Sequence, residues 1–128
     1  MKIMLCEVYK TVNYPGGIER VLCNFSNELI KRGYSVDVGV VVDRRNGANS
    51  LKEIDFVVNE GDRRIYIQSA LRMDDEEKIK SELDSFKLTN DFFKKIIIRN
   101  DITHNYYDEN GIYHCCLSDF LLNRIQLF

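Results

Sequence analysis

The sequence predicts an α/β domain with a mixed central sheet, built from an antiparallel meander plus a parallel strand and flanked by helices. Between residues 34 and 71, three apolar β-rich segments follow one another and are separated by polar turns. A helical pattern precedes these segments, and a second helical pattern follows them and leads to one more apolar segment. Consecutive strands favour antiparallel pairing, whereas a helix between two strands favours a crossover to a parallel neighbour.

The size and charge of the chain agree with one ordinary globular unit. It has 128 residues, which predicts a single domain over residues 1–128. Hydrophobic residues make up 45% of the chain and charged residues 30%, so a core can form without disulfides or a structural metal. The net charge of −2 excludes a global basic field that would attract nucleic acid, but it leaves a local basic patch open.

The N-terminal part predicts a strand, a turn and a helix. The apolar run "KIMLCEVY" has β character, and "NYPGG" after it is a turn signal. Residues 1–17 are therefore either an integral strand with a Gly-Gly turn or an appended, diverged segment, and the sequence leaves both open. The following helix ends at Gly33, which stands in the usual C-cap place after two cations. The apolar positions of this helix recur at helical spacing: Val21, Leu22, Phe25 and Leu29.

The middle of the chain predicts the meander. Strands are expected over residues 34–42, 51–58 and 65–71, with a loop over 43–50 and a turn over 59–64 between them.

The second half predicts a helix and then two further strands. The segment "DDEEKIKSELDSF" is a helix capped by Asp74 or Asp75, and its apolar stripe consists of Ile79, Leu83 and Phe86. "KKIIIRND" is a short apolar strand of the kind that is buried on both faces. "HNYYDENG" is a turn-rich loop, and "IYHCCLSDFLLNRI" is a last strand that runs into a short helix.

The cysteines and the hydropathy point to a reducing compartment. No CxxC pair is present and only two histidines are available, so no zinc site is expected. Free, mostly buried thiols predict a cytoplasmic protein. No apolar stretch approaches the roughly 20 residues that span a bilayer, and we expect neither a membrane partner nor a signal peptide. The four cysteines are Cys6, Cys23, Cys115 and Cys116.

The hairpin "KEIDFVVNEGDRRIYIQSA" carries the clearest chemical pattern. With the turn centred on Gly61 and Asp62, residues whose numbers sum to 123 face each other, and Asp55 lies opposite Gln68. Directly opposed side chains lie on one face with Cβ atoms about 5 Å apart. Two carboxylates at such positions, with a lysine two residues further along the second strand, would form a divalent-metal site.

The order of the elements and these positions resemble the core of the PD-(D/E)XK nuclease-like, restriction-endonuclease-like fold. More specifically, the chain is similar over about residues 20–124 to a C-terminal domain of unassigned function that follows an AAA-type ATPase module in many prokaryotic proteins. The resemblance rests on "NELIKRGYSVDVGVV", "KEIDFVVNEGDRRIYIQSA", "DDEEKIKSEL", "FKKIIIRND" and "GIYHCCLSDFLL". It implies that Glu28 is the helical acid and Asp55 the strand acid of the site. Gln68 and Ala70 stand where the second acid and the lysine belong.

The resemblance therefore implies a degenerate domain without a cofactor, because a carboxamide is a weak metal ligand and a methyl group cannot orient water. The implied role is a non-catalytic binding module. Its candidate partners are an AAA-type ATPase module, a second copy of the chain or nucleic acid. The chain has no P-loop motif for binding ATP itself. Arginines that could contact phosphate are Arg44, Arg45, Arg63, Arg64 and Arg72.

Two alternatives are also consistent with the sequence. The first is a residual Mg-dependent nuclease that uses Glu28 and Asp55 with a displaced lysine such as Lys52. The second rests on the first 42 residues, which resemble the opening of a family 4 type retaining glycosyltransferase. That resemblance implies that Gly16 and Gly17 approach a phosphate at a helix N-terminus, and the chain would then be a truncated N-terminal fragment.

Overall fold

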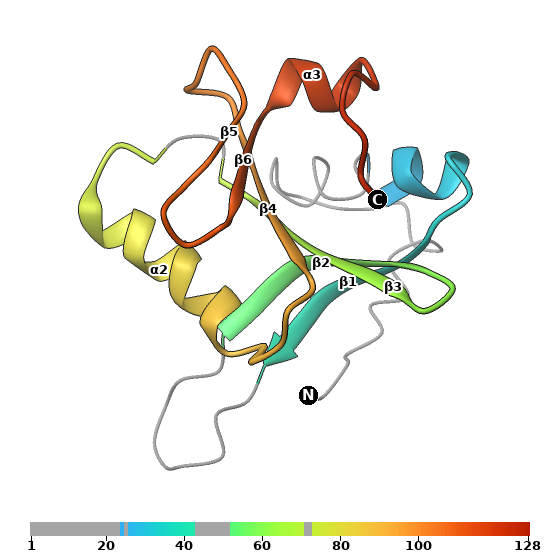
Figure 1. The fold of residues 1–128 in the computed structure, drawn as a ribbon, viewed down its shortest axis with the longest axis horizontal. Coiled ribbons are helices and arrows are strands. Elements are labelled where there is room, and N and C mark those ends of the chain that lie inside the picture. The colour runs from blue at the N-terminus through green and yellow to red at the C-terminus, as the bar shows by residue number, and fades with distance from the viewer. Residues whose placement is uncertain (1–23, 25, 43–51, 71–72) are drawn as a thin grey trace, which may run out of the picture.

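The fold is an open, mixed six-stranded sheet with helices packed against it, as the computed structural model shows in Figure 1. The structure describes residues 24, 26–42, 52–70 and 73–128. The strand order across the sheet is β1-β2-β3-β4-β6-β5. The strands are β1 (Ser35–Val42), β2 (Lys52–Glu60), β3 (Arg63–Ser69), β4 (Lys94–Arg99), β5 (Tyr106–Tyr107) and β6 (Tyr113–Cys116). The helices with described bounds are α2 (Glu76–Lys87) and α3 (Leu117–Leu121).

The topology confirms the predicted meander and crossover. Strands β1, β2 and β3 pair antiparallel in sequence order. Helix α2 then carries the chain across to β4, which pairs parallel with β3, and β6 pairs parallel with β4. One element was not predicted. Strand β5 lies within the expected loop "HNYYDENG" and pairs antiparallel with β6 over two residues.

The β2–β3 hairpin has the predicted register. The paired residues run from Phe56 opposite Ile67 to Glu60 opposite Arg63, and each pair sums to 123. The turn is tighter than expected, because both strands extend to the two residues at its centre. Gly61 makes this possible with φ of +61°, a left-handed conformation that glycine adopts without the steric cost of a side chain.

The sheet is buried on both faces, with one apolar cluster on each. On β4, Ile96 and Ile98 belong to one cluster and Ile97 to the other, as alternation along a strand requires. The α2-side cluster consists of Ile54, Val57, Tyr66, Ala70, Met73, Phe86, Ile97 and Ile112. The opposite cluster consists of Leu29, Phe56, Val58, Ile65, Ile67, Ile96, Ile98, Cys115, Phe120 and Leu127. The predicted burial of "KKIIIRND" on both faces is confirmed.

The helices form where the sequence signals placed them. The carboxylate of Asp75 accepts a hydrogen bond from the backbone N–H of Lys78 at 2.7 Å and caps α2. Phe86 is buried, and Ile79 and Leu83 pack against the α2-side cluster, so the predicted apolar stripe faces the sheet. An earlier helix ends at residue 31, and Gly33 follows it with φ of +88°.

Several predictions lie outside the described residues. They are the strand over residues 2–9, the turn over 13–17, the start of the first helix, the loop over 43–50, and Cys6 and Cys23. Cys115 and Cys116 are both buried free thiols, as expected. Within the part of the chain that the structure describes, no helix is long and apolar enough to cross a membrane.

Candidate functional site

At the end of the β2–β3 hairpin that lies away from its turn, two reciprocal hydrogen bonds link the side chains of Asp55 and Gln68 to the backbone of the opposite strand. The backbone N–H of Asp55 donates to Oε1 of Gln68 at 2.8 Å. The backbone N–H of Ser69 donates to Oδ2 of Asp55 at 2.7 Å. Each side chain therefore binds the backbone of the opposite strand, and the two together hold the strands where the regular ladder pairs end at Phe56 and Ile67.

Gln68 and Ala70 lie on the same face of the sheet. Tyr66 and Ala70 belong to the α2-side cluster, and Gln68 lies between them at the alternate position that shares this face. Both Gln68 and Ala70 are 2% exposed. The backbone N–H of Ala70 donates to the carbonyl of Ile98 at 3.0 Å, so the strand continues in register with β4. The positions that the PD-(D/E)XK resemblance assigns to the second acid and the lysine thus hold a buried amide and a buried methyl group.

Glu28 lies elsewhere in the structure. Its neighbour Leu29 is buried in the cluster on the face opposite α2. Oε1 of Glu28 accepts a hydrogen bond from Nε of Arg32 at 3.2 Å, and Nη2 of Arg32 donates to the carbonyl of Phe120 at 3.0 Å. Glu28 therefore helps to fix the first helix against α3, and the structure does not bring it to Asp55 and Gln68.

The residues at the hairpin end do not make a fitting Mg²⁺ site. Magnesium prefers near-octahedral oxygen coordination and is usually held by one or two carboxylates. Among the described side chains at this end of the hairpin, Asp55 supplies one carboxylate, and its Oδ2 already accepts the Ser69 N–H. Among the described residues, no group of three or more His, Cys, Asp or Glu side chains is placed to hold a metal ion. Lys52 begins β2, and its side chain lies outside what the structure describes.

A second polar cluster lies at the carboxyl end of β4 and beside the paired strands β5 and β6, and the sequence did not predict it. Arg99 forms a two-pronged ion pair with Asp101, with Nε–Oδ1 and Nη2–Oδ2 distances of 2.8 Å. Nη1 of Arg99 also lies 3.1 Å from the hydroxyl of Tyr106 and 3.3 Å from Nδ1 of His114. The hydrogen bonds from Arg99 lower the pKa of Asp101 far below its usual range, and the same pairing raises the pKa of Arg99.

The hydrogen-bond partners of His114 indicate its tautomer. A guanidinium can only donate hydrogen bonds, so Nδ1 of His114 accepts and Nε2 carries the proton. Nε2 then donates to Oδ2 of Asp108 at 3.0 Å. Burial opposes the charge on Asp108, but hydrogen bonds from His114 and from the backbone of Ile112 and Asn110 outweigh it and lower its pKa.

This cluster is a structural clamp. His114 is 4% exposed, and its ring stacks on that of Tyr106 with centroids 4.6 Å apart. Asp101 also accepts a hydrogen bond from the backbone N–H of Met73, which precedes α2. The cluster therefore ties together the end of β4, the β5–β6 hairpin and the approach to α2. Both ring nitrogens of His114 have partners, so this histidine is not poised as a general base.

The structure describes two of the five arginines that were candidates for phosphate contacts. Arg63 forms an ion pair with Glu60 and lies over the ring of Phe128, and Arg64 donates to Oδ1 of Asn59 at 2.9 Å. Arg44, Arg45 and Arg72 lie outside the described residues, as do Gly16 and Gly17.

Comparison with known proteins gives one informative match. No family model matches the chain. An uncharacterized protein of Haemophilus influenzae is 33% identical to it over 103 residues, which cover 80% of this chain and 21% of the relative. The chain is thus similar to about a fifth of a much longer protein.

Proposed function

We propose that this chain is a degenerate PD-(D/E)XK-like domain that acts as a non-catalytic binding module and associates with an AAA-type ATPase. The observation that carries the proposal is the reciprocal pairing of Asp55 and Gln68 with the backbone of the opposite strand. In this arrangement the two side chains stabilise the hairpin, whereas a metal site would need them to present free oxygens to an ion.

Two substitutions account for the loss of chemistry. An amide oxygen at Gln68 is neutral, so it offers a divalent cation much less than a carboxylate would. Ala70 is 2% exposed and packs in the α2-side cluster, so no ammonium group is available at the position where a nuclease of this type activates water. The residual-nuclease alternative is less well supported, because Glu28 pairs with Arg32 on a helix whose Leu29 packs on the opposite face of the sheet.

The setting of the relative supports an attached module. In the Haemophilus influenzae protein the similar segment is 21% of the whole, so most of that protein lies outside it. A domain with no P-loop motif in its sequence, and with no complete metal site among its described residues, would act in such a protein by binding, either to an adjoining module or to a separate partner.

A cleavage assay tests the proposal. The chain is incubated with plasmid and with single-stranded DNA in Mg²⁺ or Mn²⁺, next to the Asp55→Ala variant. We expect no cleavage above background from either protein. Metal-dependent cleavage by the natural chain that is abolished in Asp55→Ala would overturn the non-catalytic assignment.

A further inference from the structure

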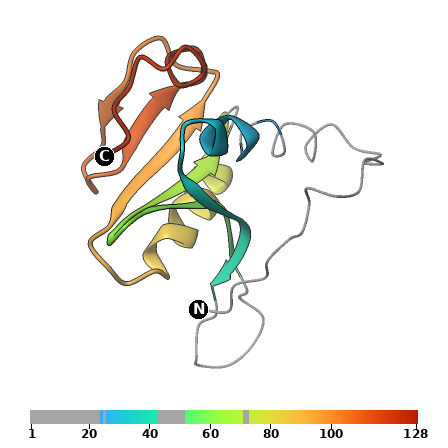
Figure 2. The ribbon, with the colours of Figure 1, turned by 90° about the vertical axis from the view of Figure 1, so that its right-hand side faces the viewer.

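The turn between β5 and β6 contains a chemically labile pair, Asn110–Gly111. The backbone nitrogen of a glycine can attack the side-chain amide of an asparagine that precedes it, because glycine has no side chain to hinder ring closure. Both residues are exposed here, so water can reach the amide and ammonia can leave. The two strands that flank the turn lie at the edge of the sheet farthest from β1 (Figure 2).

The reaction needs only water as a co-reactant. The Gly111 nitrogen loses its proton and attacks Cγ of Asn110, and the bond between Cγ and Nδ2 breaks, which releases ammonia and leaves a succinimide ring. Water then opens one of the two bonds that join the Gly111 nitrogen to a carbonyl carbon of the ring. Opening at Cγ gives aspartate, and opening at the backbone carbonyl carbon gives isoaspartate. No atom is oxidised or reduced.

Asp108 holds the labile pair in a closed turn. The carbonyl of Asp108 accepts the N–H of Gly111 at 3.0 Å, so the proton that must be lost is already hydrogen-bonded. Oδ1 of Asp108 accepts the backbone N–H groups of Asn110 at 2.9 Å and Ile112 at 3.0 Å. The N–H of Asp108 in turn donates to the carbonyl of Ile112 at 3.0 Å. These bonds must open before the Gly111 nitrogen can turn toward Cγ of Asn110.

Buried groups on both sides anchor this turn. Oδ2 of Asp108 lies 3.0 Å from Nε2 of His114, which is 4% exposed. Ile112 is 6% exposed and belongs to the α2-side cluster. Opening the turn therefore disturbs buried contacts, which keeps the open form rare. A reaction that requires a locally open form proceeds in proportion to the population of that form.

We propose that Asn110 is a latent deamidation site, which the hydrogen bonds of Asp108 keep closed and which reacts when the β5–β6 turn opens. Isoaspartate adds one carbon to the backbone before Gly111 and moves its nitrogen away from the Asp108 carbonyl. Either product also places a new carboxylate two residues from that of Asp108. A single opening event is thereby converted into a permanent loosening of this edge of the sheet. The inference goes beyond the proposed binding role and does not depend on it.

Peptide mapping by mass spectrometry measures the conversion of Asn110 in the full chain at neutral pH. We expect conversion in the folded natural chain to be slower than in guanidinium chloride by about tenfold or more, because the turn is closed. Asp108→Ala removes the carboxylate and leaves the backbone carbonyl. It should raise the folded-state rate about tenfold, as expected for the loss of two hydrogen bonds of ordinary net strength. The second Asn–Gly pair, at 46–47, lies outside the described residues and is followed in a separate peptide.

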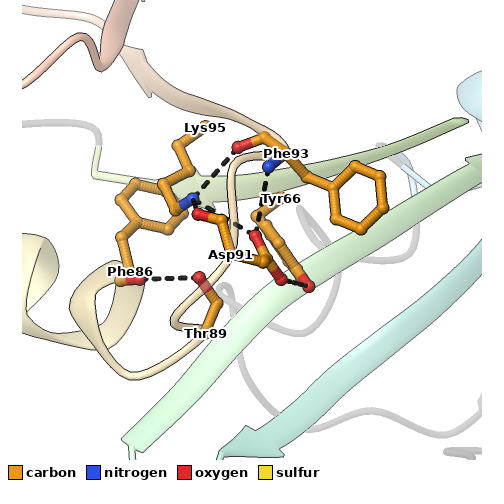
Figure 3. Close-up of polar contacts among 6 residues, drawn as sticks. All are labelled: Tyr66, Phe86, Thr89, Asp91, Phe93 and Lys95. Carbon is orange, nitrogen blue, oxygen red and sulfur yellow. Dashed lines mark hydrogen bonds and ion pairs between the residues drawn. The ribbon is translucent and has the colours of Figure 1, made fainter.

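Tyr66→Phe is the matched control. It removes the hydrogen bond from the Tyr66 hydroxyl to Oδ2 of Asp91 at 2.6 Å, which Figure 3 shows in the loop before β4. The substitution lowers the stability of the fold but leaves the hydrogen bonds of the β5–β6 turn in place. Its Asn110 should therefore react at the rate of the natural chain, which separates local opening of the turn from global unfolding.

Hydrogen exchange of the Gly111 amide in the natural chain gives a readout that needs no variant. Exchange and ring closure both begin with loss of the same proton, so this amide should exchange about tenfold or more slowly than in an unstructured peptide. An unprotected Gly111 amide would overturn the inference, as would an Asn110 that reacts equally fast in the folded and the denatured chain. So would an Asp108→Ala rate that matches the natural chain or the Tyr66→Phe control. None of these results affects the cleavage assay, so the proposed function is tested separately.

Discussion

Gln68→Ala separates a structural role of the hairpin end from a catalytic one. Gln68 is 2% exposed, and its Oε1 accepts the Asp55 backbone N–H at 2.8 Å. Leaving that donor without a partner costs about 1–3 kcal/mol. The lost methylene adds about 1 kcal/mol. We therefore expect the free energy of unfolding to fall by about 2–4 kcal/mol, which lowers the Tm by about 8–16 °C for a domain of this size.

Urea unfolding followed by circular dichroism measures this change, with Gln126→Ala as the matched control. Gln126 is exposed, and its contact with Lys94 uses the backbone carbonyl, so the control should change stability by less than about 0.5 kcal/mol. Residues selected for catalysis commonly cost stability, and their removal is often neutral or stabilising. A Gln68→Ala variant that is as stable as the control would refute the structural role assigned to this pair.

Three further predictions concern other parts of the fold. The folded-state pKa of Asp101 lies below its unfolded value of about 3.9. Its pairing with Arg99 therefore stabilises the protein above that pH, and this stabilisation is lost as the pH falls below it. Unfolding midpoints measured between pH 6 and pH 2 should fall less steeply for Asp101→Asn than for the natural chain. Tyr66→Phe removes the hydrogen bond to Asp91 and should cost about 1.5–3 kcal/mol by denaturant unfolding, with an unchanged midpoint as the opposing result. Burial raises the pKa of the Cys115 thiol to about 12, so iodoacetamide should alkylate Cys115 only in denaturant, as detected by mass spectrometry. Rapid labelling of the folded chain would contradict the placement of Cys115 in the core.

The hairpin register could be predicted because two independent signals agree. The alternation of apolar residues on β2 and β3 fixes which side chains face the core, and the central Gly61 fixes the turn. A slip of one residue would bury the wrong face of both strands, so few registers compete. For the same reason α2 was predictable, because its Asp75 cap and its apolar stripe indicate the same start and orientation.

The position of Glu28 shows what the sequence left undecided. Helical spacing predicted the helix and its apolar side, but not which face of the sheet that side would cover. The structure buries Leu29 of this helix on the face opposite α2, whereas the neighbouring Glu28 is partly exposed and pairs with Arg32. Nothing in local propensity carries this information, because it depends on which cluster the helix joins.

The clamp around Arg99 and the short strand β5 were also beyond local reasoning. Arg99 and His114 are neighbours only because β4 and β6 pair in parallel, with Arg99 opposite Cys116. Strand β5 spans two residues, and its Tyr106 is held by stacking on His114 and by Arg99. Such a segment has too few residues to produce a detectable alternation, and its conformation is set by these tertiary contacts.

Mn²⁺ binding tests whether the proposed degenerate site at Asp55, Gln68 and Ala70 has lost its metal chemistry. Isothermal titration of the natural chain with Mn²⁺ should give no saturable binding that depends on Asp55, even at millimolar metal, because the site offers one carboxylate beside a neutral amide and a methyl group. Saturable binding well below millimolar metal that disappears in Asp55→Ala would contradict the account.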